Sequence, residues 1–428
     1  MDSFVIQGGT RLSGEVTING SKNAALPIMA ACLLTEEECV IRSAPDLADV
    51  NYLMKLLEKL GARCRRDEDG ALRIKVEDDS CCLADYDTVR RMRASICVLG
   101  PLLARRRQAE ISMPGGCAIG DRPINLHLRG MEALGAKLHL ESGNIIAETN
   151  RLRGAEVFLG GPFGSTVLGT ANVMMAASLA EGRTVIESAA CEPEIVDLGN
   201  FLNRCGAGIA GHGGPRITID GVEQLHGCDY TIIPDRIEAG TFMIAAAITN
   251  GELTLKNCRT EHMMAVIDRI NRIGVNIERK NHLVQVTSAR RLNPVDITTQ
   301  PYPGFPTDLQ AQFMALLCLA DGNSILTEKI FPDRFMHIAE LNRMGARLRK
   351  EGPTVVVQGV RELTGAPVMA SDLRASAALV LAGMVAQGQT RVLRVYHIDR
   401  GYERIEEKLN AVGARIERVS DDVRQTEM

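Results

Sequence analysis

The stretch Leu57-Glu58-Lys59-Leu60-Gly61-Ala62-Arg63 is the first of six similar segments that together decide the fold. Each segment joins the apolar end of a helix, a glycine and an alternating run that is typical of a strand. The other five contain Gly135, Gly206, Gly274, Gly345 and Gly413, and successive glycines are 74, 71, 68, 71 and 68 residues apart. Because glycine adopts a left-handed conformation without steric cost, each one is predicted to end a helix.

A second helix, rich in Ala, Leu and Met, recurs in most of these units. Examples cover residues 172–182, 240–251, 312–322 and 375–388. These segments are apolar nearly all round, so the helices are predicted to be buried against other elements.

Six units with two helices and several strands each predict an α/β chain of two domains, with three units in each. We expect one domain over residues 21–229 and the other over residues 1–20 and 230–428. The strand at residues 4–6 is expected to complete the second domain. A cleft between two such domains is where a ligand is expected.

Composition narrows the class of protein. Of 428 residues 45% are hydrophobic, and 49 basic against 53 acidic residues give a net charge of -4. This balance favours neither nucleic acid nor an anionic membrane as a partner. The sequence has no apolar run of the roughly 18 residues that a membrane helix needs, and its start lacks a signal peptide pattern, so we expect a cytoplasmic protein. Its twelve cysteines form no CxxC pair, which argues against a zinc site, and most are expected to be free thiols.

Two segments have the character of anion-binding or reactive loops. Lys22 begins an Ala-rich helix that Ser21 or Asn23 caps, an arrangement that suits a phosphate, although an ordinary exposed lysine is the alternative. Cys117 lies among glycines with Arg122 nearby, which fits a nucleophile or proton donor, and an incidental thiol in a surface loop is the alternative.

Three acids stand at expected helix starts in successive units: Asp235, Asp308 and Asp372. Each is interpreted as an N-cap or, if the units converge, as a general base. Arginines in comparable positions bind anions or form structural ion pairs; they are Arg93, Arg334 and Arg400. Together these residues indicate a site for a multiply anionic substrate.

Nine motifs resemble those of the enolpyruvyl transferases, in particular the members that act on UDP-N-acetylglucosamine. They lie at residues 20–27, 92–95, 114–123, 192–197, 234–242, 305–313, 333–337, 371–383 and 396–409. The resemblance implies two inside-out α/β barrel domains, each of three repeated units, with an interdomain active-site cleft. It also implies a transferase that joins phosphoenolpyruvate to UDP-N-acetylglucosamine by addition and elimination, without a metal or organic cofactor, in the first committed step of peptidoglycan synthesis.

The resemblance also implies roles for individual residues. Cys117 is the general acid that protonates phosphoenolpyruvate and the thiol that fosfomycin alkylates; Asp308 takes the proton of the sugar hydroxyl, and Lys22 assists catalysis. Phosphoenolpyruvate binds Lys22, Asn23, Arg122, Arg374 and Arg400. UDP-N-acetylglucosamine binds Asn23, Arg93, Arg122, Pro123, Ile124, Asn125, Leu126, Ser165, Thr166, Val167, Asp308 and Ile330. Arg334 and Asp372 support the site.

Three positions depart from the family pattern: Cys97, Cys191 and the run at residues 165–170. Only the last touches expected nucleotide contacts. Two alternatives stay open, a shikimate-pathway enolpyruvyl transferase and a catalytically silent nucleotide-sugar-binding regulator. The expected partners are the two small-molecule substrates, with no nucleic acid or membrane, and a homo-oligomer stays open.

Overall fold

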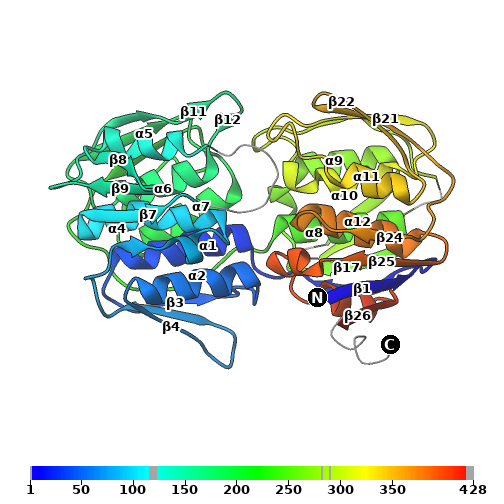
Figure 1. Ribbon diagram of the computed structural model, residues 1–428, viewed down its shortest axis with the longest axis horizontal. Helices are drawn as coiled ribbons and strands as arrows, with labels where there is room; N and C mark the ends of the chain where they lie inside the picture. The colour runs from blue at the N-terminus through cyan, green and yellow to red at the C-terminus, as the bar shows by residue number, and fades with distance from the viewer. Residues whose placement is uncertain (1, 115–122, 281–282, 289–290, 421–428) are drawn as a thin grey trace. The chain divides into compact units, whose positions relative to one another are not determined.

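The computed structural model describes residues 2–114, 123–280, 283–288 and 291–420. The chain divides into two compact units, which we call the N-unit (described residues 20–114 and 123–233) and the C-unit (described residues 2–19 and 234–420). In each unit strands surround a set of buried helices (Figure 1).

The N-unit contains three four-stranded sheets and a two-stranded ribbon. Its strands are β3 (Cys39–Arg42), β4 (Ala62–Arg66), β5 (Leu72–Val76), β6 (Leu83–Ala84), β7 (Gln108–Ser112), β8 (Lys137–Glu141), β9 (Asn144–Glu148), β10 (Glu156–Phe158), β11 (Gly160–Gly161), β12 (Gly164–Ser165), β13 (Arg183–Glu187), β14 (Gly208–Ala210), β15 (Arg216–Asp220) and β16 (Asp229–Thr231). Its helices are α1 (Lys22–Ala31), η1 (Cys32–Leu34), α2 (Ala48–Lys59), α3 (Tyr86–Val89), η2 (Arg93–Val98), α4 (Leu99–Arg106), α5 (Asn125–Ala133), α6 (Val167–Ala177) and α7 (Pro193–Arg204).

The C-unit contains three further four-stranded sheets. Its strands are β1 (Asp2–Gln7), β2 (Ser13–Thr17), β17 (Glu252–Lys256), β18 (Val275–Lys280), β19 (Leu283–Ser288), β20 (Ile297–Thr298), β21 (Asn323–Thr327), β22 (Arg347–Glu351), β23 (Thr354–Gln358), β24 (Pro367–Met369), β25 (Gln389–Leu393) and β26 (Ile416–Ser420). Its helices are α8 (Arg236–Ile248), η3 (Thr260–His262), α9 (Met264–Ile273), η4 (Thr307–Leu309), α10 (Gln310–Leu317), α11 (His337–Arg343), α12 (Leu373–Val385), η5 (Val395–Arg400) and α13 (Ile405–Ala411).

All six sheets share one pairing pattern. An edge strand runs parallel to the second strand, and the third and fourth strands each run antiparallel to the one before, as in the order β6-β7-β9-β8. In the sixth sheet the third place is taken by β1, which pairs with β25 and β26 so that Val5 faces Arg391 on one side and Glu417 on the other. The first strand of the chain therefore completes its last repeat, as expected.

The six helix-ending glycines confirm the repeat. Their φ angles are all positive: 85° at Gly61, 93° at Gly135, 102° at Gly206, 99° at Gly274, 91° at Gly345 and 108° at Gly413. A strand follows each one, namely β4, β8, β14, β18, β22 and β26. An L side chain with a Cβ is strained in this conformation, which explains why glycine recurs there.

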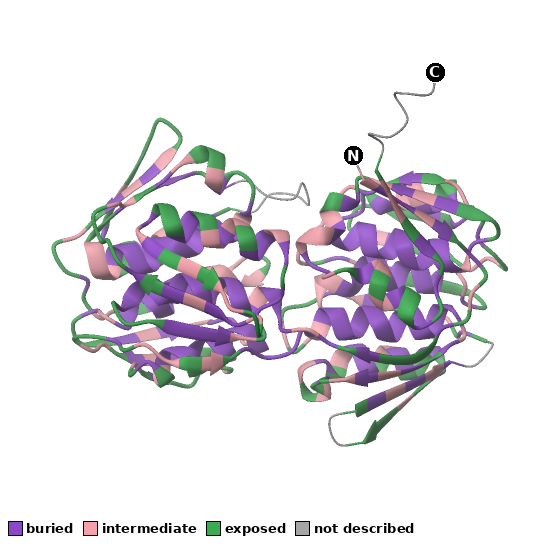
Figure 2. Cartoon of the chain, turned by 90° about the horizontal axis from the view of Figure 1, so that it is seen from below, coloured by how far each residue is buried: buried purple, intermediate pink, exposed green. Residues whose placement is uncertain are grey.

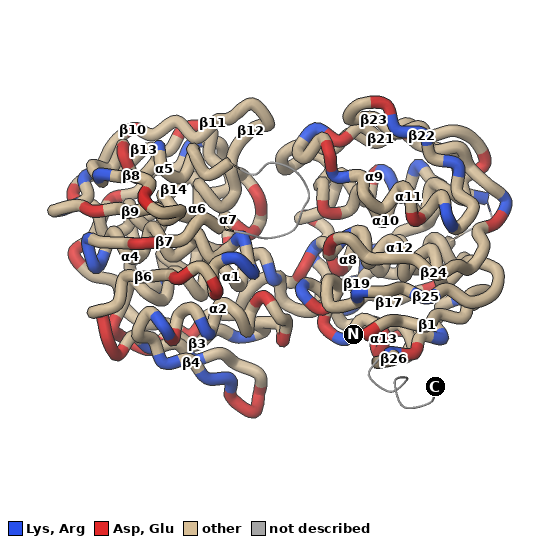
Figure 3. Tube along the Cα trace, in the orientation of Figure 1, with Lys and Arg blue, Asp and Glu red and all other residues tan. Residues whose placement is uncertain are grey.

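The four expected inner helices are α6, α8, α10 and α12, and nearly all their residues are buried (Figure 2). All four begin and end earlier than the apolar pattern predicts. Three of them start where a polar side chain caps the helix: Thr166 at α6, Asp235 at α8 and Asp372 at α12. Charged side chains gather on outer strands such as β4 and β22, whereas the trace of α10 carries none (Figure 3). No helix in the described ranges is both long and apolar enough to cross a membrane.

Candidate active site

The three acids expected at helix starts of the C-unit do not play the same part. Asp235 caps α8, because its Oδ1 accepts from the backbone of Ile237 at 2.7 Å and of Glu238 at 3.0 Å. Asp372 caps α12 in the same way, with Arg374 N at 2.9 Å. Both N-cap predictions are confirmed. Asp308 lies inside η4, and the structure shows no side-chain cap bond for that helix.

Asp308 instead receives hydrogen bonds from two arginines. Nη1 of Arg334 lies 2.8 Å from its Oδ1, and Nη2 of Arg374 lies 3.0 Å from its Oδ2. The arginine side chains are 7% and 3% exposed, whereas that of Asp308 keeps 27% of its exposure. Each carboxylate oxygen thus accepts a charge-assisted hydrogen bond from a different guanidinium.

Electrostatics at Asp308 follow from this arrangement. Burial by itself raises the pKa of the carboxyl, but the charges of Arg374 and Arg334 outweigh burial and hold its pKa well below the usual range. Burial likewise opposes the charge of Arg374, but Asp308 raises the pKa of that guanidinium. Asp308 is therefore a carboxylate at neutral pH.

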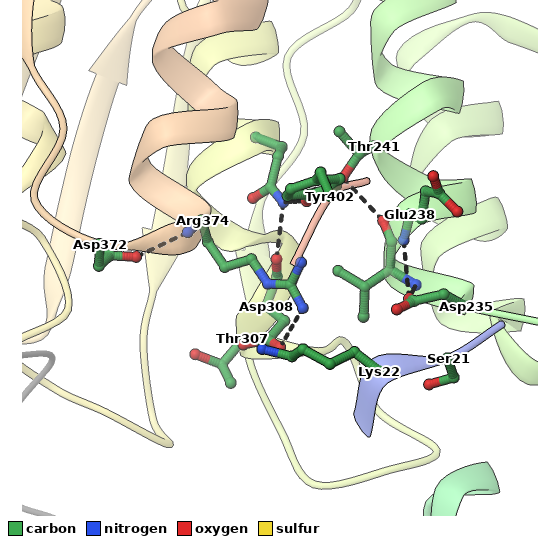
Figure 4. Close-up of polar contacts among 12 residues, drawn as sticks. Ser21, Lys22, Asp235, Glu238, Thr241, Thr307, Asp308, Asp372, Arg374 and Tyr402 are labelled. Atoms are coloured by element: carbon green, nitrogen blue, oxygen red, sulfur yellow. Dashed lines mark hydrogen bonds and ion pairs between the residues drawn. The ribbon is translucent and has the colours of Figure 1, made fainter. Parts of the chain in front are cut away.

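Arg374 lies between Asp308 and the ring of Tyr402, with 5.3 Å from its Cζ to the ring centroid (Figure 4). The Tyr402 hydroxyl is 2.8 Å from Thr241 Oγ1 and accepts from Gln312 Nε2 at 3.1 Å. The hydroxyl of Tyr402 also stabilises the charge of Arg374, after the larger effects of burial, which opposes it, and of Asp308. A guanidinium held by both a carboxylate and a phenol is a candidate for binding an anionic substrate.

Tyr402, Thr241 and Gln312 were not singled out by the sequence. All three residues lie in the C-unit, and their polar atoms are buried. Thr241 is in α8, Gln312 is in α10, and Tyr402 is in the turn after η5. In the sequence, the only indication was that a hydroxyl and an amide occur inside otherwise apolar helices. That pattern does not predict which groups they contact.

Arg334 is also held by a second pair of side chains, those of Thr307 and Glu328. Its Nη1 also donates to Thr307 Oγ1 at 3.0 Å, and Thr307 donates to Glu328 Oε2 at 2.9 Å. Glu328 is fully buried, and its Oε1 accepts from the backbone of Ile330 at 2.8 Å. Sequence reasoning missed Glu328, which fixes the backbone at the expected sugar-contact residue Ile330.

The remaining candidates of the C-unit lie near two histidines. His337 is buried, and burial followed by the charge of Arg334 lowers its pKa to about 4, although Asp372 opposes this. Burial and then Arg400 lower the pKa of His397. Arg400 itself ends η5 and is half-buried.

In the N-unit Ser21 rather than Asn23 caps α1, since Ser21 Oγ accepts from Ala24 N at 3.3 Å. Lys22 is buried, and its Nζ lies 3.0 Å from Oδ2 of Asp49 on α2. The alternative of an exposed lysine is therefore wrong. Asn23 is half-buried. The ion pair with Asp49 fixes the position of the buried Lys22 ammonium group, which the sequence did not predict.

Arg93 begins η2, and its Nη1 donates to the carbonyl of Pro114 at 3.3 Å. Behind it, Asn172 on α6 donates to Nδ1 of His127 at 2.9 Å and to the carbonyl of Ile96 at the same distance. Burial, followed by the charge of Arg93, lowers the pKa of His127 to about 3. This neutral buried pair fixes α6 against η2 and α5.

The expected nucleotide contacts fall at two helix starts of the N-unit. Asn125 and Leu126 open α5, preceded by exposed Pro123 and buried Ile124. Ser165 ends β12, and Thr166 caps α6 by accepting from Gly169 N at 3.2 Å, with half-buried Val167 as the first helical residue.

Two of the three departures from the family pattern are cysteines of the N-unit. Burial raises the pKa of the Cys97 thiol to about 12 and, less strongly, that of Cys191. Both are thiols at neutral pH. Cys117 and Arg122 lie outside the described residues.

The chain is similar to named enzymes over almost its whole length. It is 54% identical over 98% of its length to a UDP-N-acetylglucosamine 1-carboxyvinyltransferase of Methylacidiphilum infernorum, covering 99% of that protein. It is 52% identical over 99% of its length to the enzyme of the same name from Akkermansia muciniphila, covering all of it.

The chain belongs to the UDP-N-acetylglucosamine 1-carboxyvinyltransferase family. This family shares a wider family model, EPSP synthase (3-phosphoshikimate 1-carboxyvinyltransferase), which matches residues 6–409. The enolpyruvyl transferase NikO from Streptomyces tendae superposes with a TM-score of 0.89 at 25% identity, over 98% of this chain and 99% of that one. EPSP synthase from Acinetobacter baumannii shares the fold, with a TM-score of 0.77 at 17% identity over 98% and 100% of the two chains. The expected fold class and family are confirmed.

Proposed function

We propose that this chain transfers the enolpyruvyl group of phosphoenolpyruvate to the 3′-hydroxyl of UDP-N-acetylglucosamine and releases phosphate. The observation that carries the proposal is the identity above 50%, over almost the whole chain, to relatives that are named for this reaction. The product is the first committed intermediate of peptidoglycan synthesis. We place the reaction in the cytoplasm, where thiols such as those of this chain stay reduced.

The reaction is an addition followed by an elimination. The sugar oxygen adds to C2 of phosphoenolpyruvate while a proton adds to its methylene carbon, and loss of phosphate and a proton then restores the double bond. Cys117 is proposed as the acid for the methylene carbon. Lys22, Asn23, Arg122, Arg374 and Arg400 are proposed to bind phosphoenolpyruvate.

Asp308 is proposed to take the proton of the sugar hydroxyl. Its two arginine partners bear on when it can do so. A carboxylate held by two guanidinium groups has a depressed pKa and is a weak base. An anionic substrate that binds Arg374 competes with Asp308 for the arginine charge. Binding of phosphoenolpyruvate would then raise the pKa of Asp308 and make it a stronger base for the sugar hydroxyl.

The N-unit is proposed to bind the nucleotide sugar. Arg93 supplies a positive charge, and the start of α6 at Ser165, Thr166 and Val167 supplies backbone N–H groups and a helix dipole that favour a diphosphate. The start of α5 at residues 123–126 is proposed as a second contact. In the C-unit Asp308 and the backbone at Ile330 face the sugar in this proposal, with Arg334 and Asp372 as supporting residues.

The test is phosphate release from phosphoenolpyruvate with purified chain. Release is expected with UDP-N-acetylglucosamine, and at least 100-fold more slowly without it or with shikimate 3-phosphate, because a bound acceptor must supply the oxygen nucleophile. The ether product is identified by mass spectrometry. Release with shikimate 3-phosphate alone would assign the chain to the shikimate pathway, and absence of release with either acceptor would leave a nucleotide-sugar-binding protein.

A further inference from the structure

Four cysteines that are scattered in the sequence come together in the N-unit. Cys32 begins η1, Cys39 begins β3, Cys205 caps the end of α7, and Cys228 directly precedes β16. We call these four residues the thiol cluster. None of them is a residue of the proposed active site, so the proposed reaction gives no reason for their proximity.

The cluster is held by contacts between its members. Sγ of Cys205 lies 3.4 Å from Sγ of Cys228. Cys205, Cys228 and Cys32 all affect the pKa of Cys39. The backbone ties the same segments together, since His226 N donates to the carbonyl of Cys205 at 2.8 Å and Val40 N to that of Cys228 at 2.8 Å.

The members differ in their access to solvent. Cys32, Cys39 and Cys205 are at most 2% exposed, whereas Cys228 is half-buried. A small oxidant in solution therefore meets Cys228 first. The described donor groups include no set of three or more His, Cys, Asp or Glu side chains placed to hold a metal ion.

The negative charge of the cluster is favoured on Cys39. Hydrogen bonds from Cys205, then Cys228 and Cys32, lower its pKa against the opposing effect of burial. At Cys228 the hydrogen bond with Cys205 lowers the pKa, but Cys39 and burial raise it, and the result is a pKa of about 12. A lowered pKa makes Cys39 a weak base, so the proton of Cys228 is lost to solvent, from which Cys228 is only half-buried.

We propose that Cys205 and Cys228 form an intramolecular disulfide when a peroxide oxidises the reduced protein. A disulfide has an S–S bond of about 2.05 Å, so the two sulfur atoms need to approach by about 1.4 Å from their present separation. Cys205 caps the end of α7, and Cys228 directly precedes β16, which is an edge strand, so the shift falls outside the central strands of the sheet.

The reaction balances with hydrogen peroxide as the oxidant. Cys228 loses its proton to solvent, and the thiolate attacks one peroxide oxygen; an S–O bond forms, the O–O bond breaks, and the leaving hydroxide takes a proton from solvent and becomes water. Sγ of Cys205 then attacks Sγ of the sulfenic acid. The S–S bond forms, the S–O bond breaks, and hydroxide leaves with the Cys205 proton as a second water.

This bond would fasten the end of α7 to the start of β16, the last strand of the N-unit. A reduced cytoplasm keeps it open, and oxidative stress closes it reversibly. The site is therefore a redox modification site that is separate from Cys117.

Trypsin makes the test direct. Cleavage after Arg204, Arg216 and Arg236 places Cys205 in peptide 205–216 and Cys228 in peptide 217–236, each with one cysteine. The full chain is treated with hydrogen peroxide, its remaining thiols are blocked, and it is digested without reductant. The expected product is the two peptides joined with a loss of two hydrogens, released again by dithiothreitol. A link from 217–236 to 23–42, which contains Cys32 and Cys39, or no link at all, would overturn the assignment.

Variants supply the controls. Cys205→Ser and Cys228→Ser should abolish the joined product, whereas Cys64→Ser, another half-buried cysteine of this unit, should leave it unchanged. Oxidation should also raise the melting temperature of the wild type by about 5 °C, because the bond closes a loop of the unfolded chain. An equal shift in Cys228→Ser would contradict the proposal even if that variant is less stable at the outset.

Discussion

Nη2 of Arg374 lies 3.0 Å from Oδ2 of Asp308, although 66 positions separate the two residues in the chain. The relationship depends on two helix starts. Asp372 caps α12 and thereby places Arg374 in its first turn, while Asp308 lies in η4 directly before α10. The pair explains why Asp308 differs from Asp235 and Asp372, since its carboxylate is directed at side chains and not at its own helix.

Asp308→Ala should therefore act differently from a cap deletion. We expect turnover to fall by about two to four orders of magnitude if Asp308 takes the sugar proton. The free energy of unfolding should also fall by about 3 kcal/mol, because Arg334 and Arg374 lose the partner of a largely buried pair. Steady-state kinetics and urea unfolding measure the two effects.

Asp235→Ala is the matched control at a true cap. Loss of its bonds to the α8 backbone should cost about 0.5 to 2 kcal/mol of stability and leave turnover within a few fold of wild type. Similar losses of turnover in both variants would rule out the proton-accepting role of Asp308.

Variants of Lys22 and Asp49 distinguish a role of Lys22 in substrate binding from a purely structural role. Lys22→Gln should raise the KM for phosphoenolpyruvate by about 10- to 100-fold, the worth of a hydrogen bond between charged groups. Asp49→Asn keeps the lysine and removes only its charged neighbour at 3.0 Å. We expect it to change KM far less. Equal changes in KM would show that Lys22 acts only through its ion pair.

His127 should make stability depend on pH. Its pKa in the folded protein is about 3, below the value of about 6.5 expected when unfolded, so the unfolded state binds the proton first as pH falls. The contribution is complete above pH 6.5 and is lost progressively toward pH 3. Between pH 7 and pH 5 the wild type should lose about 2 kcal/mol more than His127→Gln. Parallel urea-unfolding profiles would show that His127 does not titrate in this way.

Tyr402 supports Arg374 through its ring and the surrounding network through its hydroxyl. Tyr402→Phe should cost about 1 kcal/mol of stability, because Thr241 and Gln312 lose a buried partner, and should keep most turnover. Tyr402→Ala also removes the ring beneath the guanidinium and should raise the KM for phosphoenolpyruvate. A similar KM in the two variants would assign Tyr402 a purely structural part.

Much of the fold could be predicted because its signals are local. A glycine that ends a helix needs a positive φ at its own position, and all six repeats carry one. Asp235 and Asp372 cap helices by accepting hydrogen bonds from N–H groups two and three residues ahead. Their role as caps can therefore be predicted from the adjacent sequence. The burial of the apolar helices could be predicted equally well, because a helix without a polar face is not stable at the protein surface.

Contacts between distant segments were beyond such reasoning. By itself the sequence determined the six repeats, their helix ends and the caps, because backbone conformation and hydrogen bonds to near neighbours depend on residues a few positions apart. Only the tertiary structure decided that Asp308 pairs with Arg334 and Arg374, that Asp49 holds Lys22, and that Cys205 meets Cys228. Those partners come from different units of the repeat or from separate elements, and the packing of helices and sheets, which no local pattern encodes, sets the distance between them.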